Sequence, residues 1–179
     1  LLHISKTSRC PLRDTVSVLL SFKAGLRVAE VAGLSWTDVT DAMGAVADEI
    51  TVPNSIAKKG SGRAIPMHPA LTSALQWLHT TSPPSHRHPS APVVRGSITP
   101  RMNGHSLEMY IGRLFRDMGL YGVSSHSGRR SFITAAARQA NPVGCSIRDV
   151  QSLAGHRYLD TTEAYIERSA RVHELVKGL

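Results

Sequence analysis

Apolar residues recur at spacings of three and four along much of the chain, which is the pattern of amphipathic helices. Gly25 and Pro142 add helix-ending signals, because glycine suits a C-cap and proline does not continue a helix. The pattern predicts helices in these segments: Arg13–Lys23, Arg27–Leu34, a stretch beginning at His68, Ser106–Met118, a stretch around Ile133, a stretch beginning at Ser146, and a stretch from Asp160 to about Lys177.

Between the second and third predicted helices, the pattern changes to that of short strands. Asp48–Ile56 carries several β-branched residues, and Ala64–Met67 predicts a short returning strand. The polar, glycine-containing segment Lys58–Arg63 joins the two as a hairpin turn, and Ala42–Val46 would add a third strand. The sequence therefore predicts an α+β fold that is mainly helical, with a small three-stranded antiparallel sheet, in a single domain over residues 1–179.

Residues 82–100 are rich in proline, serine and histidine, and they predict a long, mobile loop on the surface. His79, His86 and His88 lie in or beside this segment, but neither cysteine nor an acidic residue stands near them. Metal sites normally combine such ligand types at short spacings. We therefore expect neither a metal nor another cofactor.

Composition argues against a membrane-spanning chain and against a disulfide-rich secreted domain. The 179 residues are 41% hydrophobic, which is enough for a core, and no apolar run approaches the length of a membrane span. Cys10 and Cys145 lack metal-type spacing, which favours buried thiols in a reducing, cytoplasmic compartment. Leu1 is not a natural start residue, so we expect a fragment of a longer protein.

The charge balance indicates the kind of partner. The chain has 21 Lys and Arg against 13 Asp and Glu, a formal net charge of +8. Many of its arginines stand beside serine, glycine and histidine rather than in helical pairs with glutamate. This balance favours an anionic partner, with nucleic acid as the first candidate, over a basic protein without such a partner.

The segment Leu153–Tyr165 has the pattern of a helix end, a turn at His156 and the start of another helix. Asp160 and Glu163 stand three residues apart, which predicts a capping box at the new helix. A tyrosine such as Tyr165 near a histidine has three ordinary uses: a core hydrogen bond, a surface contact or a nucleophile. Taken alone, the core hydrogen bond is favoured, because tyrosines are commonly half buried with a bonded hydroxyl.

Five sequence elements that occur in order along the chain favour the nucleophile over the core hydrogen bond for Tyr165. They are Gly25–Val31, an arginine box; Trp36–Asp38 after it; Lys58, eight residues before Pro66; His126–Arg129, a His-x-x-Arg box; and Leu153–His156 with Tyr165 nine residues beyond His156. Together they resemble the tyrosine recombinase family, the phage integrases and their relatives. A single His-x-x-Arg would carry no weight, whereas five matching elements are specific. The resemblance covers nearly the whole chain and implies the catalytic core of a DNA breaking-rejoining enzyme.

The resemblance implies site-specific DNA recombination or integration by strand cleavage and rejoining. Tyr165 would attack phosphorus and form a covalent 3′-phosphotyrosine, so that bond energy is conserved and ATP is not needed. Lys58 would protonate the leaving 5′-oxygen as general acid. Lys59 is adjacent in the hairpin, so the choice between the two lysines stays open.

The same resemblance implies how the phosphate is held. Arg27 and Arg129 would clamp it, since each guanidinium can meet two phosphate oxygens and stays charged. His126 would accept the tyrosine proton or donate to phosphate, because histidine titrates near neutrality. His156 would hydrogen-bond the phosphate, or serve as a structural histidine in a turn. Arg27 also has the alternative of an ion pair with Glu30.

Double-stranded DNA is the expected partner. The basic residues expected to contact it, besides the catalytic ones, are Lys59, Arg63, Arg130 and Arg157. By resemblance, the protein would form a tetramer on DNA, with the C-terminal helix around Val172 and Val176 docked on a neighbour. The separate N-terminal core-binding domain that family members carry is absent from this chain. A bacterial or phage-derived, nucleoid-associated protein is expected.

Ser127-Gly128 is a departure from the family, which usually has a bulkier pair between the histidine and arginine of this box. Gly128 removes a packing side chain, and we expect it to loosen the turn that holds Arg129. Three alternatives to recombination remain: a catalytically inactive, prophage-derived DNA-binding remnant, a type IB topoisomerase-like activity that relaxes DNA, and, distantly, a metal hydrolase.

Overall fold

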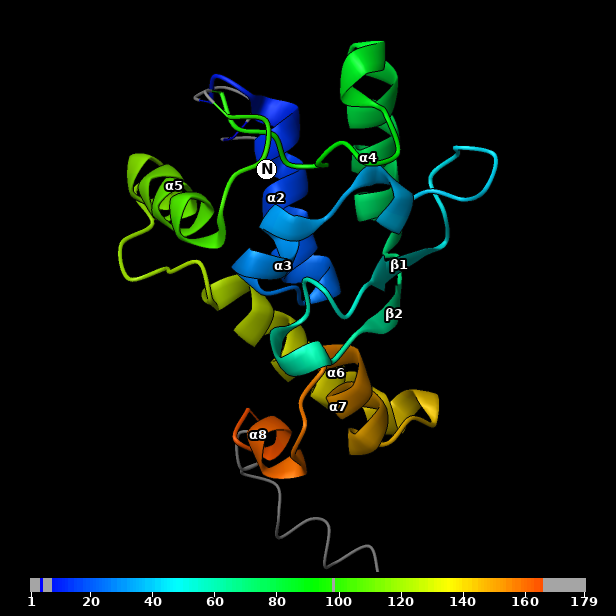
Figure 1. Cartoon of the computed structure of the whole chain (residues 1–179). Coiled ribbons are helices and arrows are strands. Elements are labelled where there is room, and N and C mark those ends of the chain that lie inside the picture. Colours follow the sequence, from blue (N-terminus) through cyan, green and yellow to red (C-terminus); the bar gives the residue numbers. More distant parts are fainter. Residues whose placement is uncertain (1–3, 5–7, 98, 166–179) are drawn as a thin grey trace, which may run out of the picture.

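The computed structural model describes residue 4, residues 8–97 and residues 99–165 (Figure 1). In chain order the elements are α2 (Pro11–Ala24), α3 (Val28–Gly33), the 3₁₀ turn η1 (Trp36–Asp38), β1 (Glu49–Val52), η2 (Lys58–Gly60), β2 (Arg63–Pro66), α4 (Pro69–Thr81), η3 (Pro84–His86), α5 (Gly104–Asp117), α6 (Ser127–Ala140), η4 (Asn141–Val143), α7 (Ile147–Ala154) and α8 (Leu159–Glu163). The mainly helical fold with a small antiparallel sheet is confirmed. The predicted helix beyond Tyr165 lies outside the described residues. Within them, no helix is both long and apolar enough to cross a bilayer.

Helix α2 is central to the packing. Helices α4 and α6 pack against it, and α3 packs against α5 (Figure 1). Leu20 of α2 is fully buried together with Leu26 and Leu34, and these residues belong to the main core. A smaller apolar cluster forms between α6 and α7 around Ile133 and Val150. This second cluster supports the end of the molecule where α6, α7 and α8 gather (Figure 1).

Gly25 ends α2 as predicted, with a left-handed φ of 64°. A side chain is excluded there for a second reason, because a Cβ would lie 2.3 Å from the ring of Phe132 in α6. Helix α6 can therefore approach the end of α2 closely. This approach brings the start of α6 next to the Gly25–Arg27 turn, from which Arg27 enters the site.

The sheet has two strands, so the prediction of a third strand at Ala42–Val46 is wrong. β1 and β2 pair antiparallel, with Ile50 opposite Ile65. The Asp41 carboxylate accepts hydrogen bonds from the backbone N–H groups of Met43 and Ala45, both at 2.9 Å. These bonds close a tight turn, which leaves only an isolated bridge between Thr40 and Val46.

The segment 82–100 is not simply a surface loop, which corrects the sequence-based expectation. The indole N–H of Trp36 donates to the carbonyl of His86 at 2.8 Å, and the Trp36 backbone N–H donates to Ala91. Val93 and Val94 are buried in the main core. The proline-rich composition gave no sign that Val93 and Val94 are buried or that the segment packs on the Trp36 ring.

Two predicted helix starts also need correction. Asn103, not Ser106, caps α5, since its side chain accepts from the Ser106 backbone N–H. Helix α8 begins at Leu159 after Tyr158, so Asp160 lies inside its first turn rather than at the cap. The predicted start of α7 after Ser146 is confirmed, with the Asp149 carboxylate accepting from the Ser146 backbone N–H at 2.7 Å.

Candidate active site

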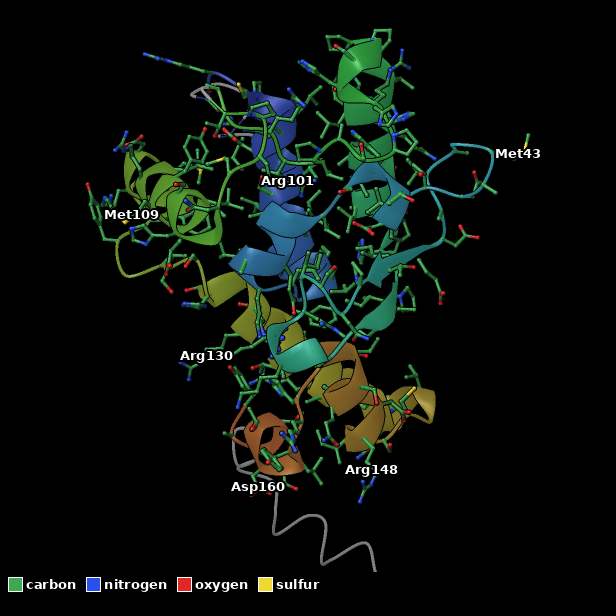
Figure 2. All side chains as sticks on the ribbon, viewed as in Figure 1. Met43, Arg101, Met109, Arg130, Arg148 and Asp160 are labelled. Carbon is green, nitrogen blue, oxygen red and sulfur yellow. The ribbon has the colours of Figure 1, made fainter. Side chains whose placement is uncertain are left out.

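The sequence-predicted basic residues gather around two neighbouring pockets at one end of the molecule. The larger, called here the basic pocket, has a volume of about 720 Å³ and is lined by Arg27, Lys58, Lys59, Gly60, Ser61, Gly62, Arg63, Arg148, Gln151, Ser152, Gly155, His156, Arg157, Tyr158 and Thr161. The smaller, of about 580 Å³, is lined by Gly122, Ser124, His126, Ser127, Arg130, Thr161, Ala164 and Tyr165. Thr161 lines both. Figure 2 shows Arg130 and Arg148 projecting outward on opposite sides of this end.

Arg27 is the residue directly before α3, and its side chain lines the basic pocket. Its backbone N–H donates to Glu30 Oε2 at 2.9 Å, and its guanidinium donates to Glu30 Oε1 at 2.9 Å and to the Gly155 carbonyl at 3.2 Å. The Arg27 side chain is 22% exposed, whereas that of Glu30 is 1% exposed. The ion pair weighed against a phosphate role is thus present, and it orients the arginine toward the basic pocket.

Glu30 is a buried carboxylate, whereas the sequence predicted it only as the partner of Arg27 in an ion pair. Burial raises its pKa, but hydrogen bonds from Arg63 and Arg27 and their charges outweigh this, so the pKa lies below its ordinary value. The i,i+3 spacing from Arg27 was the available signal. The second partner, Arg63, is far away in sequence, so neither spacing nor pattern revealed it.

Arg129 lies beneath the pockets and is buried in the first turns of α6. Its two terminal nitrogens donate to the carbonyls of Gly25 and Ala154, both at 2.5 Å. Burial, followed by the charge of Arg27, lowers the pKa of Arg129 to about 10, although Glu30 opposes this. The guanidinium is therefore still charged at neutral pH.

Gly128 tightens the packing around Arg129, contrary to the expectation that it loosens the turn. A Cβ at this position would lie 2.5 Å from the hydroxyl of Ser21 and 2.6 Å from the ring of Phe22. Gly128 is buried and lets α6 lie against α2 without a spacer. The small residue thus fixes the position of Arg129.

His156 follows the left-handed Gly155, which has a φ of 61° and ends α7. Its Nδ1 lies 2.9 Å from the hydroxyl of buried Thr162, and its ring stacks on that of Tyr165 with centroids 5.8 Å apart. Burial, then the charges of Arg129 and Arg27, lower the pKa of His156 to about 4. The ring is therefore neutral at pH 7, and either Nδ1 or the Thr162 hydroxyl can be the donor in their contact.

Tyr165 is half buried, and it borders the same pocket as His126. The hydroxyl of Thr134 in α6 donates to the Tyr165 carbonyl at 3.3 Å, and the ring packs against the α6–α7 cluster. The predicted nucleophile therefore shares a pocket with His126 and stacks on His156, and the charges of Arg129 and Arg27 act on His156.

The remaining candidates are more exposed. The His126 side chain is 73% exposed, and its Nε2 lies 3.6 Å from a carboxylate oxygen of Glu108 in α5. Lys58 and Lys59 are exposed in η2 at the rim of the basic pocket, and Lys59 has a positive φ of 59°. The structure therefore places both lysines at the same pocket and does not choose between them.

Several residues of the site were absent from the sequence-based set. They are Glu30, Glu108, Arg148, Tyr158 and Thr162, which come from α3, α5, α7 and the α8 segment. Of the predicted DNA contacts, Arg130 and Arg157 are exposed beside the pockets. Within the described part of the chain, no group of three or more His, Cys, Asp or Glu is arranged to hold a metal ion.

Known proteins share this sequence pattern. The sequence profile of the phage integrase family matches residues 1–171. Tyrosine recombinase XerC of Rhizobium meliloti (strain 1021) is 27% identical over 165 residues, which cover 91% of this chain and 48% of that protein. Tyrosine recombinase XerD of Shewanella oneidensis (strain ATCC 700550) is 29% identical over 170 residues, covering 91% and 52% respectively. The chain thus spans about half the length of the curated relatives it matches.

Solved structures share the fold. The crystal structure of XerA recombinase superposes with a TM-score of 0.71 at 21% identity, over 99% of this chain and 59% of that one. The Tn1549 transposon integrase in complex with circular intermediate DNA gives a TM-score of 0.73 at 17% identity, over 99% and 61%. The architecture is therefore that of tyrosine recombinase catalytic domains. The chain belongs to the phage integrase family.

Proposed function

We propose that this chain is the catalytic domain of a site-specific recombinase, which cleaves and rejoins DNA through a covalent 3′-phosphotyrosine. The observation that carries the proposal is the convergence of four side chains on two adjoining pockets. Arg27 and His156 line the basic pocket, Tyr165 lines the smaller pocket and stacks on His156, and Arg129 donates to the Ala154 carbonyl two residues before His156. The names of the relatives support it, since they are tyrosine recombinases.

Tyr165 is the proposed nucleophile. Its hydroxyl oxygen attacks the phosphorus, the bond from phosphorus to the 5′-oxygen breaks, and a 3′-phosphotyrosyl bond forms. The proton of the phenol needs an acceptor during the attack, and His126 borders the same pocket. The departing 5′-oxygen takes a proton from Lys58. Attack by another 5′-hydroxyl reverses these steps and joins two strands.

The arginines and His156 stabilise the transition state. Negative charge grows on the non-bridging oxygens, and preorganised donors in a partly dehydrated site stabilise it more than water does. Arg27 and Arg129 supply fixed positive charge near this position. The neutral ring of His156 is proposed to donate through Nε2, in the tautomer whose Nδ1 accepts from the Thr162 hydroxyl. Burial of a neutral histidine avoids adding a third positive charge.

Flanking DNA is proposed to lie across the two pockets. Lys59, Arg157 and Arg130 are exposed at their edges and suit phosphate contacts, which give affinity without reading sequence. We propose assembly as a tetramer on DNA through the segment that follows Tyr165, for which the sequence predicts a helix. DNA binding by this chain should weaken steeply with salt, because phosphate contacts release counterions.

The test is a covalent trapping experiment. The 179-residue chain is incubated with a pool of nicked DNA duplexes whose sequence around the nick is randomised. Cleavage releases the short strand between the nick and the cut, which prevents rejoining and traps a denaturation-resistant adduct. Sequencing of the trapped DNA then identifies the preferred site.

The expected result is an adduct that forms in the presence of EDTA and disappears in Tyr165→Phe. An adduct that persists in this variant would overturn the assignment of the nucleophile. Binding to duplex DNA with no adduct from any member of the pool would favour an inactive DNA-binding remnant. Relaxation of an arbitrary supercoiled plasmid would favour a topoisomerase-like activity.

A further inference from the structure

Arg63 is the most deeply enclosed basic side chain among those predicted to contact DNA. It begins β2, and its side chain is only 7% exposed. Its terminal nitrogens donate to the two carboxylate oxygens of Glu30 at 3.1 Å and 3.0 Å. Its Nε donates to the Leu153 carbonyl at 2.8 Å. A planar guanidinium makes all three bonds at once, which an ammonium group does not.

These three bonds join segments that are far apart in sequence. Through Glu30, Arg63 is linked to α3 and to Arg27, which shares the same carboxylate. Through Leu153, it is linked to the last turn of α7, two residues before the turn that carries His156. On its own strand, it directly follows the hairpin that carries Lys58. Arg63 therefore contacts all three supports of the basic pocket.

The turn before His156 is shaped around this guanidinium. A Cβ on Gly155 would lie 2.8 Å from Nη1 of Arg63 and 3.1 Å from its Cζ. Gly155 also needs its left-handed φ of 61°. Glycine therefore lets the backbone of the turn rest on Arg63, and the position of the turn depends on the position of the guanidinium.

The same contacts argue against a direct role in DNA binding. Phosphate contacts come from side chains that present free N–H groups to the duplex, as the exposed Arg157 does at the pocket edge. Arg63 directs its fork at a buried carboxylate instead. Turning it toward DNA would leave Glu30 with Arg27 as its remaining partner, and an underpaired buried charge is costly.

We propose that Arg63 is a positioning residue of the active site and not a DNA contact. It holds Arg27, through Glu30, and His156, through the Leu153 carbonyl, in fixed register with the lysine hairpin. The role in catalysis rests on the proposed function, whereas the role in holding His156 is a property of the fold.

The first arm of the test separates binding from chemistry. Arg63→Lys keeps the charge, and so the fold, but loses the fork. At saturating nicked duplex from the trapping experiment, we expect its adduct to form at least about tenfold more slowly, with DNA affinity within about twofold of the wild type. Arg157→Gln is the comparison, and it should weaken DNA binding and reduce the salt slope by about one.

The second arm needs no activity. The imidazole signals of His156, followed by two-dimensional NMR without DNA, should shift in Arg63→Lys while those of His88 in the 82–100 segment stay in place. Arg63→Gln should move the His156 signals further, and if that variant does not fold, Arg63→Lys alone decides.

Two results would overturn the proposal. One is a loss of DNA affinity and of salt dependence in Arg63→Lys or Arg63→Gln like that of Arg157→Gln, with adduct formation at saturating DNA unchanged. The other is a set of His156 signals identical to the wild type. A wild-type chain that forms no adduct would refute the proposed recombinase activity, yet the NMR arm would still decide whether Arg63 positions His156.

Discussion

The proposed active site has two regions that are built differently. The floor consists of Arg27, Glu30, Arg63 and Arg129, whose side chains are partly or fully buried and bonded to carboxylate or carbonyl oxygens. The rim consists of Lys58, His126 and Tyr165, which lie on a hairpin, at a helix start and near the end of the described chain.

The difference follows from what each region has to do. A phosphate clamp works best with charges whose positions are settled before the substrate arrives, because no reorganisation is then needed. Proton carriers and a nucleophile must approach different atoms of the bound strand, so exposed segments suit them better. Substitutions in the floor should therefore affect both stability and chemistry, whereas rim substitutions should affect chemistry alone.

The largest effect in the floor is expected for Arg129→Lys. A lysine does not bridge the Gly25 and Ala154 carbonyls together, so one donor toward the phosphate moves or is lost. Removing one such donor typically slows a reaction by about 10²–10³-fold. Single-turnover adduct formation at saturating nicked duplex measures this. Arg116→Lys, an exposed substitution in α5, is the matched control and should leave the rate unchanged. A loss below tenfold for Arg129→Lys would show that the floor tolerates movement.

Glu30→Gln should lower stability more than any rim substitution. The neutral amide leaves Arg27 and Arg63 without their shared buried charge, and breaking such a pair typically costs about 3 kcal/mol. Denaturant unfolding at pH 7 measures this loss.

The stabilisation by Glu30 also depends on pH. Since the folded pKa of Glu30 lies below the ordinary 4.5, its contribution is present above that pH and is lost as the pH falls through the folded pKa. The exposed Glu49→Gln in β1 is the control, expected within about 0.5 kcal/mol of the wild type. Equal stabilities would mean that Glu30 does not hold the floor together.

The two regions also differ in how far the sequence predicted them. Arg27, Arg129 and His156 stand in short local motifs, so spacing located them. The structure brings Arg27 and His156 to one pocket and joins Arg129 to the Ala154 carbonyl beside it. Glu30 pairs with Arg63 across 33 residues, and such a contact has no local pattern. Likewise, the helices followed from periodicity, but the buried second half of segment 82–100 did not, because its contacts with Trp36 are long-range.

The next effect is a pH dependence that belongs to His156. Its folded pKa of about 4 lies below the ordinary 6.5, because burial and Arg129 disfavour the charged ring. Between about pH 6.5 and 4, His156 is protonated in the unfolded chain but still neutral in the folded chain. This residue therefore makes the free energy of unfolding fall as the pH falls. In His156→Gln that part of the slope should vanish. Unfolding measured at intervals from pH 7 to pH 4 compares the two, and identical slopes would contradict the burial of this ring among the floor arginines.

The smallest effect is expected at the rim, for Glu108→Gln. The Glu108 carboxylate lies 3.6 Å from His126 Nε2 and accepts a hydrogen bond from Ser125 at 3.2 Å. Both partners of the His126 pair are well exposed, at 73% and 45%, and such pairs contribute about 0–1 kcal/mol. We therefore expect adduct formation at saturating duplex to stay within about threefold of the wild type. A tenfold loss with the fold intact would mean that Glu108 orients His126 as firmly as Glu30 orients Arg27. The division between a fixed floor and a loosely held rim would then be wrong at its most exposed point, because a solvent-facing pair would be shaping the chemistry.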